Sequence, residues 1–227
     1  MKISAKIRAY FAFASTMFYV GILIIVLFFN RKRHPQLRKW ICKRIFKIND
    51  IDFELSGEVD PKAQLLLLNH QSFLDIILLE LVNPGNLAWV AKRELFNIPF
   101  FGHTVKMPDM IAVDREDKNG LKKLISDAQK RLNQNRIIVI FPEGTRGSGK
   151  KILKYKAGAQ FIANKLDLVV QPFVISSTLN LLNVKEMLMT PGTIKITALP
   201  SFKASEAGKN WIEETRNQTV EIFNRDN

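Results

Sequence analysis

Residues 64–81 read QLLLLNHQSFLDIILLEL, and this stretch decides the fold class. Its first part, residues 64–68, has the length and composition of a buried β-strand, and residues 72–81 carry apolar side chains at helical spacing. The polar pair Asn69-His70 lies between them, where a strand would end and a helix begin. A strand that passes directly into a helix is typical of α/β proteins.

The same alternation of strand and helix patterns continues along the chain. Strands are predicted at residues 64–68, 87–91, 110–113, 136–141, 168–174 and 193–198. Helices are predicted at residues 72–81, 118–133, 157–166 and 205–223. We therefore expect an α/β fold with a mostly parallel central sheet flanked by helices. In such sheets, ligands bind beyond the carboxyl ends of the strands.

The N-terminal part of the chain has a different pattern. Residues 10–29 carry no charge, and about 20 residues of helix can cross a hydrocarbon core of about 30 Å. A cleaved signal peptide is the competing interpretation, but the apolar run is too long for one and no small-residue cleavage site follows Phe29. The pattern indicates an uncleaved membrane anchor.

A second N-terminal helix is predicted at residues 35–48. Its apolar side chains recur at helical spacing beside a basic row: Leu37, Trp40, Ile41, Ile45 and Ile48 with Lys39, Lys43 and Lys47. This pattern favours an amphipathic helix on an anionic membrane surface over a linker helix packed on the globular domain. We expect a membrane-anchoring helical segment at residues 1–50 and an α/β domain at residues 51–227.

The net charge of +13 first suggests a nucleic-acid-binding protein, but the distribution of the charge along the chain argues against that function. Residues 1–50 hold eleven Lys and Arg and one acid, whereas the remainder holds 23 basic and 20 acidic residues. A nucleic-acid partner is therefore not expected.

Eight basic residues follow the apolar run and three precede it, which favours a cytoplasmic globular domain. A hairpin that dips into one leaflet is an alternative. The lone Cys42 fits a reducing compartment.

The turn after the first predicted strand carries a candidate base. The imidazole of His70 is the natural group for removing a hydroxyl proton near neutral pH. It is a better base when a carboxylate fixes its tautomer and stabilises the imidazolium that forms. Asp75 is placed to do so if His70 precedes the helix, and the segment from Ser72 to Asp75 is typical of a capping-box start. The alternative is that Asp75 is only a cap and His70 only a loop residue.

A second candidate element is the run Phe141-Pro142-Glu143-Gly144-Thr145-Arg146, which follows a buried strand. Glycines let backbone N–H groups approach an anion, and an arginine binds phosphate with two hydrogen bonds. Glu143 is expected to orient Arg146 or to bind a substrate hydroxyl. A solvated surface turn is the alternative. Arg115, at the end of another predicted strand, is either functional or simply where that strand reaches water.

In combination, these segments resemble the glycerolipid acyltransferase family, and most closely its lysophosphatidic acid acyltransferases. The resemblance covers roughly residues 60–200, in family order. The blocks that carry it are Asn69-His70 through Asp75, Ala91-Lys92-Arg93-Glu94-Leu95 with Pro99-Phe100-Phe101-Gly102, Val113-Asp114-Arg115, Phe141 to Arg146, Tyr155-Lys156-Ala157-Gly158-Ala159 and Gln171-Pro172-Phe173-Val174. Ala112 and Gln171 depart from the usual residue types.

The resemblance implies transfer of a fatty-acyl group from acyl-CoA or acyl-carrier protein to the sn-2 hydroxyl of lysophosphatidic acid at an inner membrane. His70 would be the base and Asp75 its orienting partner. The acceptor would be bound by Arg115, Glu143, Gly144, Thr145, Arg146, Lys92 and Lys156. Glycerol-3-phosphate or a lyso-aminolipid is an alternative acceptor, and an inactive membrane-binding relative is the alternative outside enzymes. We expect no cofactor and no metal, since no His/Cys cluster has metal-ligand spacing.

Overall fold

The fold is described from a computed structural model of the 227-residue chain, which describes residues 2–30, 34–114 and 120–226. In these residues, eight strands form one sheet in the order β1-β9-β6-β2-β5-β3-β4, with β10 paired to β6. The strands are β1 (Ile51–Ser56), β2 (Leu65–Leu68), β3 (Asn86–Lys92), β4 (Ile111–Val113), β5 (Arg136–Ile140), β6 (Val169–Ser176), β9 (Gly192–Ala198) and β10 (Phe202–Lys203).

The central part of the sheet is parallel. Strands β6, β2, β5, β3 and β4 all pair in parallel, and Leu65 of β2 lies opposite Ile138 of β5 and Val170 of β6. Strand β9 runs antiparallel to β6, and β1 pairs with β9 in parallel at the edge. The predicted sheet is therefore confirmed as mostly parallel, and its parallel strands end at one common edge.

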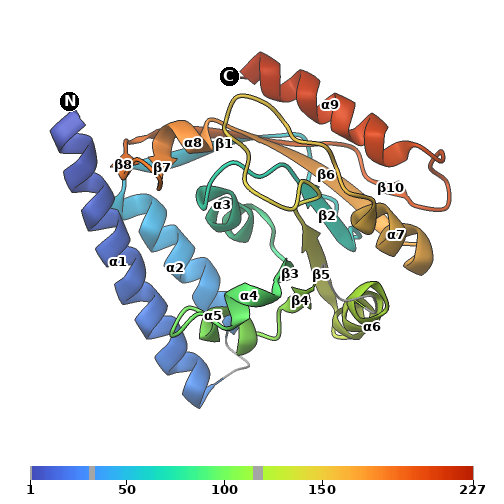
Figure 1. Cartoon of the computed structure of the whole chain (residues 1–227), viewed down its shortest axis with the longest axis horizontal. Helices are drawn as coiled ribbons and strands as arrows, with labels where there is room; N and C mark the ends of the chain where they lie inside the picture. Colours follow the sequence, from blue (N-terminus) through green and yellow to red (C-terminus); the bar gives the residue numbers. More distant parts are fainter. Residues whose placement is uncertain (1, 31–33, 115–119, 227) are drawn as a thin grey trace.

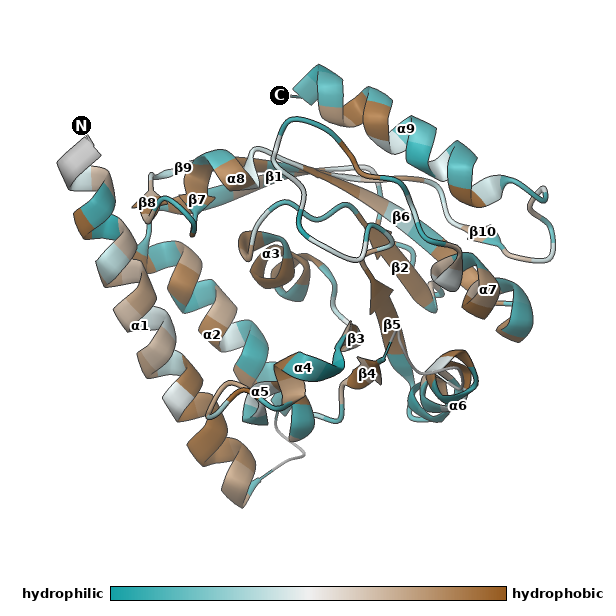
Figure 2. Cartoon of the chain, viewed as in Figure 1, coloured by the Kyte–Doolittle hydropathy of each residue, from teal (hydrophilic) through white to brown (hydrophobic). Residues whose placement is uncertain are grey.

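Helices cover both faces of this sheet (Figure 1). They are α1 (Lys2–Phe29), α2 (His34–Ile48), α3 (Leu74–Val82), α4 (Arg93–Phe96), α5 (His103–Lys106), α6 (Gly120–Leu132), α7 (Ala157–Leu166), α8 (Thr178–Leu181) and α9 (Trp211–Asp226). Alternate residues of β2 face opposite cores: Leu66 and Leu68 pack towards α1, α2 and α3, and Leu65 and Leu67 pack towards α6 and α7. Figure 2 shows α3 and the central strands as the most hydrophobic elements.

The two N-terminal helices pack against the sheet domain. Helix α1 is long and apolar enough to cross a membrane, over Ser4–Phe29, and it contacts α2, α5 and the small β7–β8 hairpin (Leu182–Asn183, Leu188–Met189). Its buried residues, such as Leu23 and Leu27, share one core with α2 and α3.

The predicted orientation of α2 is wrong for part of its apolar row. Ile41 and Ile45, which were expected to face a membrane, are buried in the core beside Cys42 and Phe46. Trp40 and the basic row face outward instead, and the Arg44 guanidinium lies 5.2 Å from the centre of the Trp40 ring. Helix α2 is thus packed on the domain through Ile41 and Ile45, as in the alternative interpretation, whereas Trp40 and Ile48 of the same predicted row are exposed.

Candidate active site

The site forms where the parallel strands end. Asn69 and His70 follow β2, Phe141 to Arg146 follow β5, and Lys92 ends β3. The side chain of Asn69 joins the ends of β2 and β6. Its amide oxygen accepts the backbone N–H of Ile175 at 2.8 Å, and its amide nitrogen donates to the Ile175 carbonyl at 2.7 Å. This exchange fixes the start of the turn that carries His70.

The imidazole of His70 and the carboxylate of Asp75 are in contact, as predicted. Nδ1 of His70 lies 2.8 Å from Oδ2 of Asp75, and that oxygen also accepts the backbone N–H groups of Gln71 and Ser72 at 2.7 and 2.9 Å. Asp75 is completely buried. Its carboxylate fixes the ring with Nδ1 inward, which leaves Nε2 as the ring nitrogen available to a substrate.

The capping-box prediction is half right. Helix α3 begins at Leu74, and Asp75 reaches back to the backbone of the entering turn as a capping box requires. Ser72 does not cap the helix, because its hydroxyl donates instead to the carbonyl of Leu182 at 3.0 Å.

Thr178 is a site residue that sequence analysis missed. Its hydroxyl donates to Oδ1 of Asp75 at 2.6 Å, so both oxygens of the buried carboxylate have donors. Thr178 begins α8 directly after β6, at the same edge of the sheet. The available signal was the run Ser176-Ser177-Thr178, a group of hydroxyl residues that follows a buried strand.

The ring of His70 rests on an aromatic stack. It lies over the Phe141 ring at 3.8 Å between centroids and an interplanar angle of 12°, and Phe141 stacks on Trp89 at 5.5 Å. The ring N–H of Trp89 donates to Oε1 of Glu80 at 2.7 Å. Packing on one face and the carboxylate on one edge therefore hold the imidazole in a single orientation.

Glu143 lies behind the site rather than beside Arg146. Its Oε1 accepts the backbone N–H of His70 at 2.6 Å, and its Oε2 accepts that of Leu153 at 2.7 Å. Burial raises the pKa of Glu143 to about 7, opposed by these two hydrogen bonds. Its expected role in orienting Arg146 or binding substrate is thus replaced by a positioning role, because both oxygens hold backbone groups and the side chain is buried.

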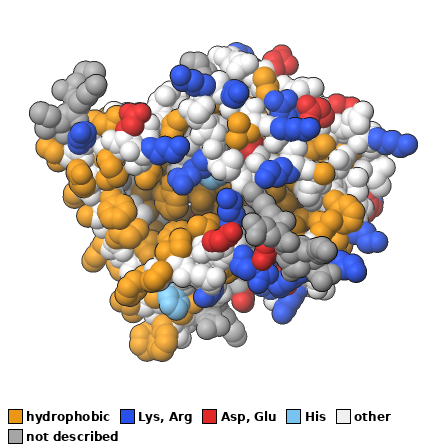
Figure 3. Space-filling view, viewed as in Figure 1, with side chains coloured by type: hydrophobic (Ala, Val, Ile, Leu, Met, Phe, Trp, Pro, Cys, Tyr) orange, Lys and Arg blue, Asp and Glu red, His pale blue; other side chains and the backbone are white. Residues whose placement is uncertain are grey.

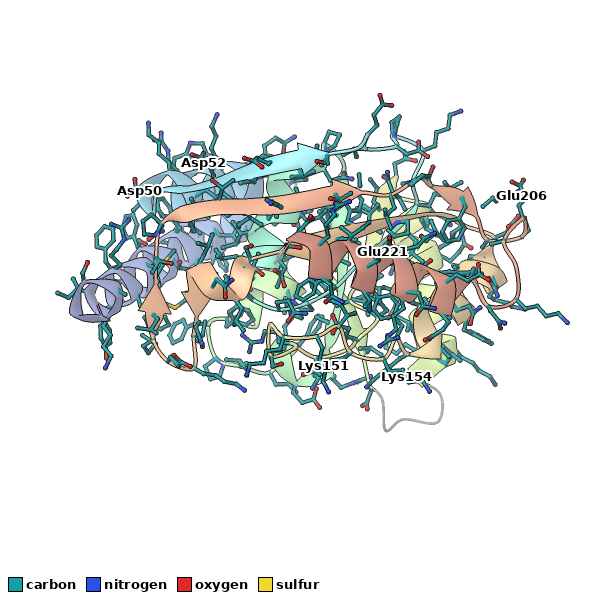
Figure 4. The ribbon with its side chains drawn as sticks, turned by 90° about the horizontal axis from the view of Figure 1, so that it is seen from above. Asp50, Asp52, Lys151, Lys154, Glu206 and Glu221 are labelled. Carbon is teal, nitrogen blue, oxygen red and sulfur yellow. The ribbon has the colours of Figure 1, made fainter. Side chains whose placement is uncertain are left out.

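The loop after β5 closes on the His70 turn. The N–H of Gly147 donates to the carbonyl of His70 at 2.7 Å, and the N–H of Gly149 donates to the side-chain oxygen of Gln71 at 2.8 Å. A Cβ on Gly147 would lie 2.7 Å from that oxygen, so a larger residue there would displace the Gln71 side chain. In Figure 4, Lys151 and Lys154 of this loop lie at the edge of the molecule opposite Asp50 and Asp52.

A cavity of about 840 Å³ opens at this edge of the sheet. Most of the predicted site residues line it, namely His70, Lys92, Gly144, Thr145, Arg146 and Lys156. Arg115, the remaining cation of the predicted set, lies outside the described residues. Behind this polar mouth the walls are mainly apolar and include residues of α1, α2, α3 and α5, such as Val20, Leu23, Ile41 and Ile45. Sequence analysis did not predict that the N-terminal helices line the site.

Chemically, this arrangement places one oriented base at the polar mouth of an apolar cavity. In the described ranges, no group of three or more His, Cys, Asp or Glu side chains is placed to hold a metal ion.

The sequence and the fold are both similar to those of known proteins. The sequence model of the family described as "Acyltransferase" matches residues 51–176. The 1-acyl-sn-glycerol-3-phosphate acyltransferase of Helicobacter pylori is 40% identical over 199 residues, which cover 86% of this chain and 84% of that protein. The enzyme of the same name from Escherichia coli is 27% identical over 151 residues, 66% of this chain and 61% of that protein.

The fold also resembles a solved structure. The crystal structure of the 1-acyl-sn-glycerophosphate (LPA) acyltransferase PlsC from Thermotoga maritima superposes with a TM-score of 0.77 at 23% identity. The match covers 98% of this chain and 96% of that one, so the N-terminal helices belong to the shared fold.

Proposed function

Because the chain belongs to the acyltransferase family, we propose that it transfers a fatty-acyl group from a thioester to the sn-2 hydroxyl of 1-acyl-sn-glycerol-3-phosphate, giving phosphatidic acid. The observation that carries this proposal is the His70–Asp75 pair at the polar mouth of an apolar cavity. A lipid has the same division, with a polar end that reacts and an acyl chain that avoids water.

In the proposed reaction, Nε2 of His70 removes the proton from the acceptor hydroxyl. The oxygen attacks the thioester carbonyl, the carbon–sulfur bond breaks and an ester bond forms. The imidazolium then returns its proton to the departing thiolate, so the enzyme ends as it began. Asp75 stabilises the charged ring during this step. Acyl-CoA and acyl-carrier protein both supply such a thioester.

Three cations at the mouth suit the acceptor phosphate. Lys92 ends β3, Arg146 and Lys156 lie in the connection between β5 and α7, and all three line the same cavity as His70, together with Gly144 and Thr145. Arg146 is proposed as the main phosphate ligand, since a guanidinium binds phosphate oxygens with two hydrogen bonds. The predicted role of Arg115 in phosphate binding stays part of this proposal.

The proposed location is the inner membrane, with the catalytic domain on the cytoplasmic face. The excess of basic residues after the apolar run supports this orientation. Helix α1 packs beside α2, whose Lys43, Arg44 and Lys47 are exposed. If α1 crossed the whole bilayer, these cations would enter hydrocarbon at high cost, which supports a helix embedded in one leaflet.

The test uses full-length protein purified in detergent, with lysophosphatidic acid, glycerol-3-phosphate and a lyso-aminolipid offered separately with each thioester donor. We expect product from lysophosphatidic acid and a loss of about 10²–10⁴-fold in turnover for His70→Ala, with the unfolding temperature unchanged. If the variant kept most of its activity, the proposed base would be wrong. Preference for another acceptor would instead change only the proposed substrate.

A further inference from the structure

The loop between α4 and α5 presents an aromatic side chain to the outside of the molecule. Residues 97–102 form this loop, and Phe100 at its tip is 80% exposed, more than any other aromatic side chain described outside α1. Ile98 is exposed beside it. The next residue, Phe101, points the other way and lines the cavity. Adjacent side chains of one loop thus face the surroundings and the substrate cavity.

The backbone holds Phe100 in this position. Its φ angle is 59°, a left-handed conformation that is rare for a bulky residue. Short hydrogen bonds close the loop around it: the N–H of Phe101 donates to the Pro99 carbonyl at 2.7 Å, and that of Gly102 to the Ile98 carbonyl at 2.8 Å. A Cβ on Gly102 would lie 2.3 Å from the Phe96 carbonyl oxygen. The exposed phenyl ring therefore belongs to a tightly built turn.

This loop continues the apolar outer surface of α1. Helix α5, which follows the loop, contacts α1, and residues of α4 and α5 pack on the core that contains Leu23 and Leu27. On the outer side of the same part of α1, Phe28 and Phe29 are exposed. Figure 3 shows hydrophobic side chains along the edge formed by α1 and down to the region of α4 and α5. Exposed His103 and Lys106 border the loop with polar groups.

We propose that residues 97–102 are a second membrane contact, in which Phe100 and Ile98 enter the same lipid leaflet as α1. Exposed apolar side chains, here Phe100 and Ile98, bordered by a lysine are typical of protein surfaces that enter a membrane interface. The loop then forms the rim of the cavity at the lipid surface, and an acyl chain leaves the leaflet past Phe101. The proposed insertion of Phe100 is argued from the structure and does not depend on the proposed function, whereas the proposed route of the acyl chain does depend on it.

Insertion is tested with a nitroxide spin label on full-length protein bound to anionic phospholipid vesicles. Cys42 is buried, so a cysteine introduced at Phe100 is the labelled position. We expect a label at Phe100→Cys to be more accessible to oxygen than to a water-soluble nickel chelate, like a label at Phe18→Cys on α1. A label at Phe161→Cys, an exposed phenylalanine of α7, is the aqueous control. Equal behaviour of the Phe100 and Phe161 labels would overturn the proposal.

The acyl-chain route is tested with Phe100→Ser, which removes an exposed ring and is expected to leave the unfolding temperature unchanged. Turnover of lysophosphatidic acid in vesicles should fall roughly tenfold, from the lost burial of one phenyl ring, while turnover of a monomeric short-chain acceptor stays within about twofold. Phe161→Ser should change neither rate. An equal loss on both acceptors, or no loss on vesicles, contradicts the route. A wild-type protein that acylates neither acceptor refutes the proposed function and leaves the spin-label result to stand.

Discussion

At the scale of single residues, Glu143 connects the position of the base to pH. Its carboxylate accepts the backbone N–H of His70 while buried, and burial raises its pKa from 4.5 to about 7. A raised pKa means that the folded protein binds the proton more tightly than the unfolded chain does. The contribution of Glu143 to stability is therefore fully present below pH 4.5 and is lost as the pH rises through about 7.

We expect the difference in unfolding free energy between the wild-type protein and Glu143→Gln to decrease as the pH rises from 4.5 to about 7. A shift of about 2.5 units corresponds to roughly 3 kcal/mol. Denaturant unfolding at a series of pH values measures it. The pKa of His34, lowered to about 4 by burial, acts in the opposite direction but is common to both proteins, so the difference isolates Glu143. A difference that does not change with pH would contradict the raised pKa.

The pairing of His70 with Asp75 was predictable from sequence because both residues belong to one strand, turn and helix. Thr178 was not, since 103 positions separate it from Asp75 and only the fold brings them together. Glu143 was assigned to the wrong partner. Its nearness to Arg146 in sequence suggested a pair, but a buried carboxylate is satisfied by whichever N–H groups the chain brings to it, here two from the backbone.

At the scale of elements, a buried ion pair connects α2 and α3. Arg38 of α2 lies 3.5 Å from Oε1 of Glu80 on α3, and it also donates to the carbonyl of Leu87 at 3.2 Å. Glu80 in turn accepts the ring N–H of Trp89 on β3. This cluster lies in the cavity wall behind the base.

Removing the cation alone should be costly. Arg38→Met leaves the carboxylate of Glu80 buried without its partner, and we expect a loss of about 3–5 kcal/mol in unfolding free energy. The double variant Arg38→Met/Glu80→Gln keeps an acceptor for Trp89 without the charge, so it should recover most of that loss. Thermal or denaturant unfolding of both variants, with Glu80→Gln alone as a control, decides this. A double variant as unstable as the single one would show that charge is not the cause.

The sequence predicted six of the sheet strands because each is a short apolar or β-branched run between turns. It did not predict β1, because apolar and polar residues alternate there instead of forming such a run, and all residues after Ile51 are exposed. Nor did it predict the antiparallel direction of β9, which depends on a connection through α8 and the β7–β8 hairpin. The surroundings of Ile41 and Ile45 in α2 were mispredicted, because an apolar side chain at helical spacing is expected to avoid water but can do so against either lipid or protein.

At the scale of the whole molecule, α1 is both a part of the core and an outer surface. Leu27 is completely buried against the domain, whereas its neighbour Phe28 is 75% exposed. Substitutions at these two adjacent residues can therefore distinguish the packing of α1 in the core from its role as an outer surface.

Leu27→Ser should lower the unfolding free energy in detergent by about 2–5 kcal/mol, whereas Phe28→Ser should change it by less than about 0.5 kcal/mol. In vesicle flotation the order should reverse, with Phe28→Ser weakening membrane association and Leu27→Ser, where still folded, retaining it. If Leu27→Ser were as stable as the wild-type protein, α1 would be an attached anchor rather than part of the domain.

Trp89 has a consequence for how this protein can be observed. Its indole stacks on Phe141, which carries the imidazole of His70, and it lies in the wall of the cavity. The other two tryptophans differ in setting: Trp40 is exposed on α2, and Trp211 is buried on α9 away from that wall. With both replaced by phenylalanine, the tryptophan fluorescence comes from Trp89 alone. The colour and intensity of its emission should then report, without any attached dye, when a lipid chain fills the cavity and when it leaves.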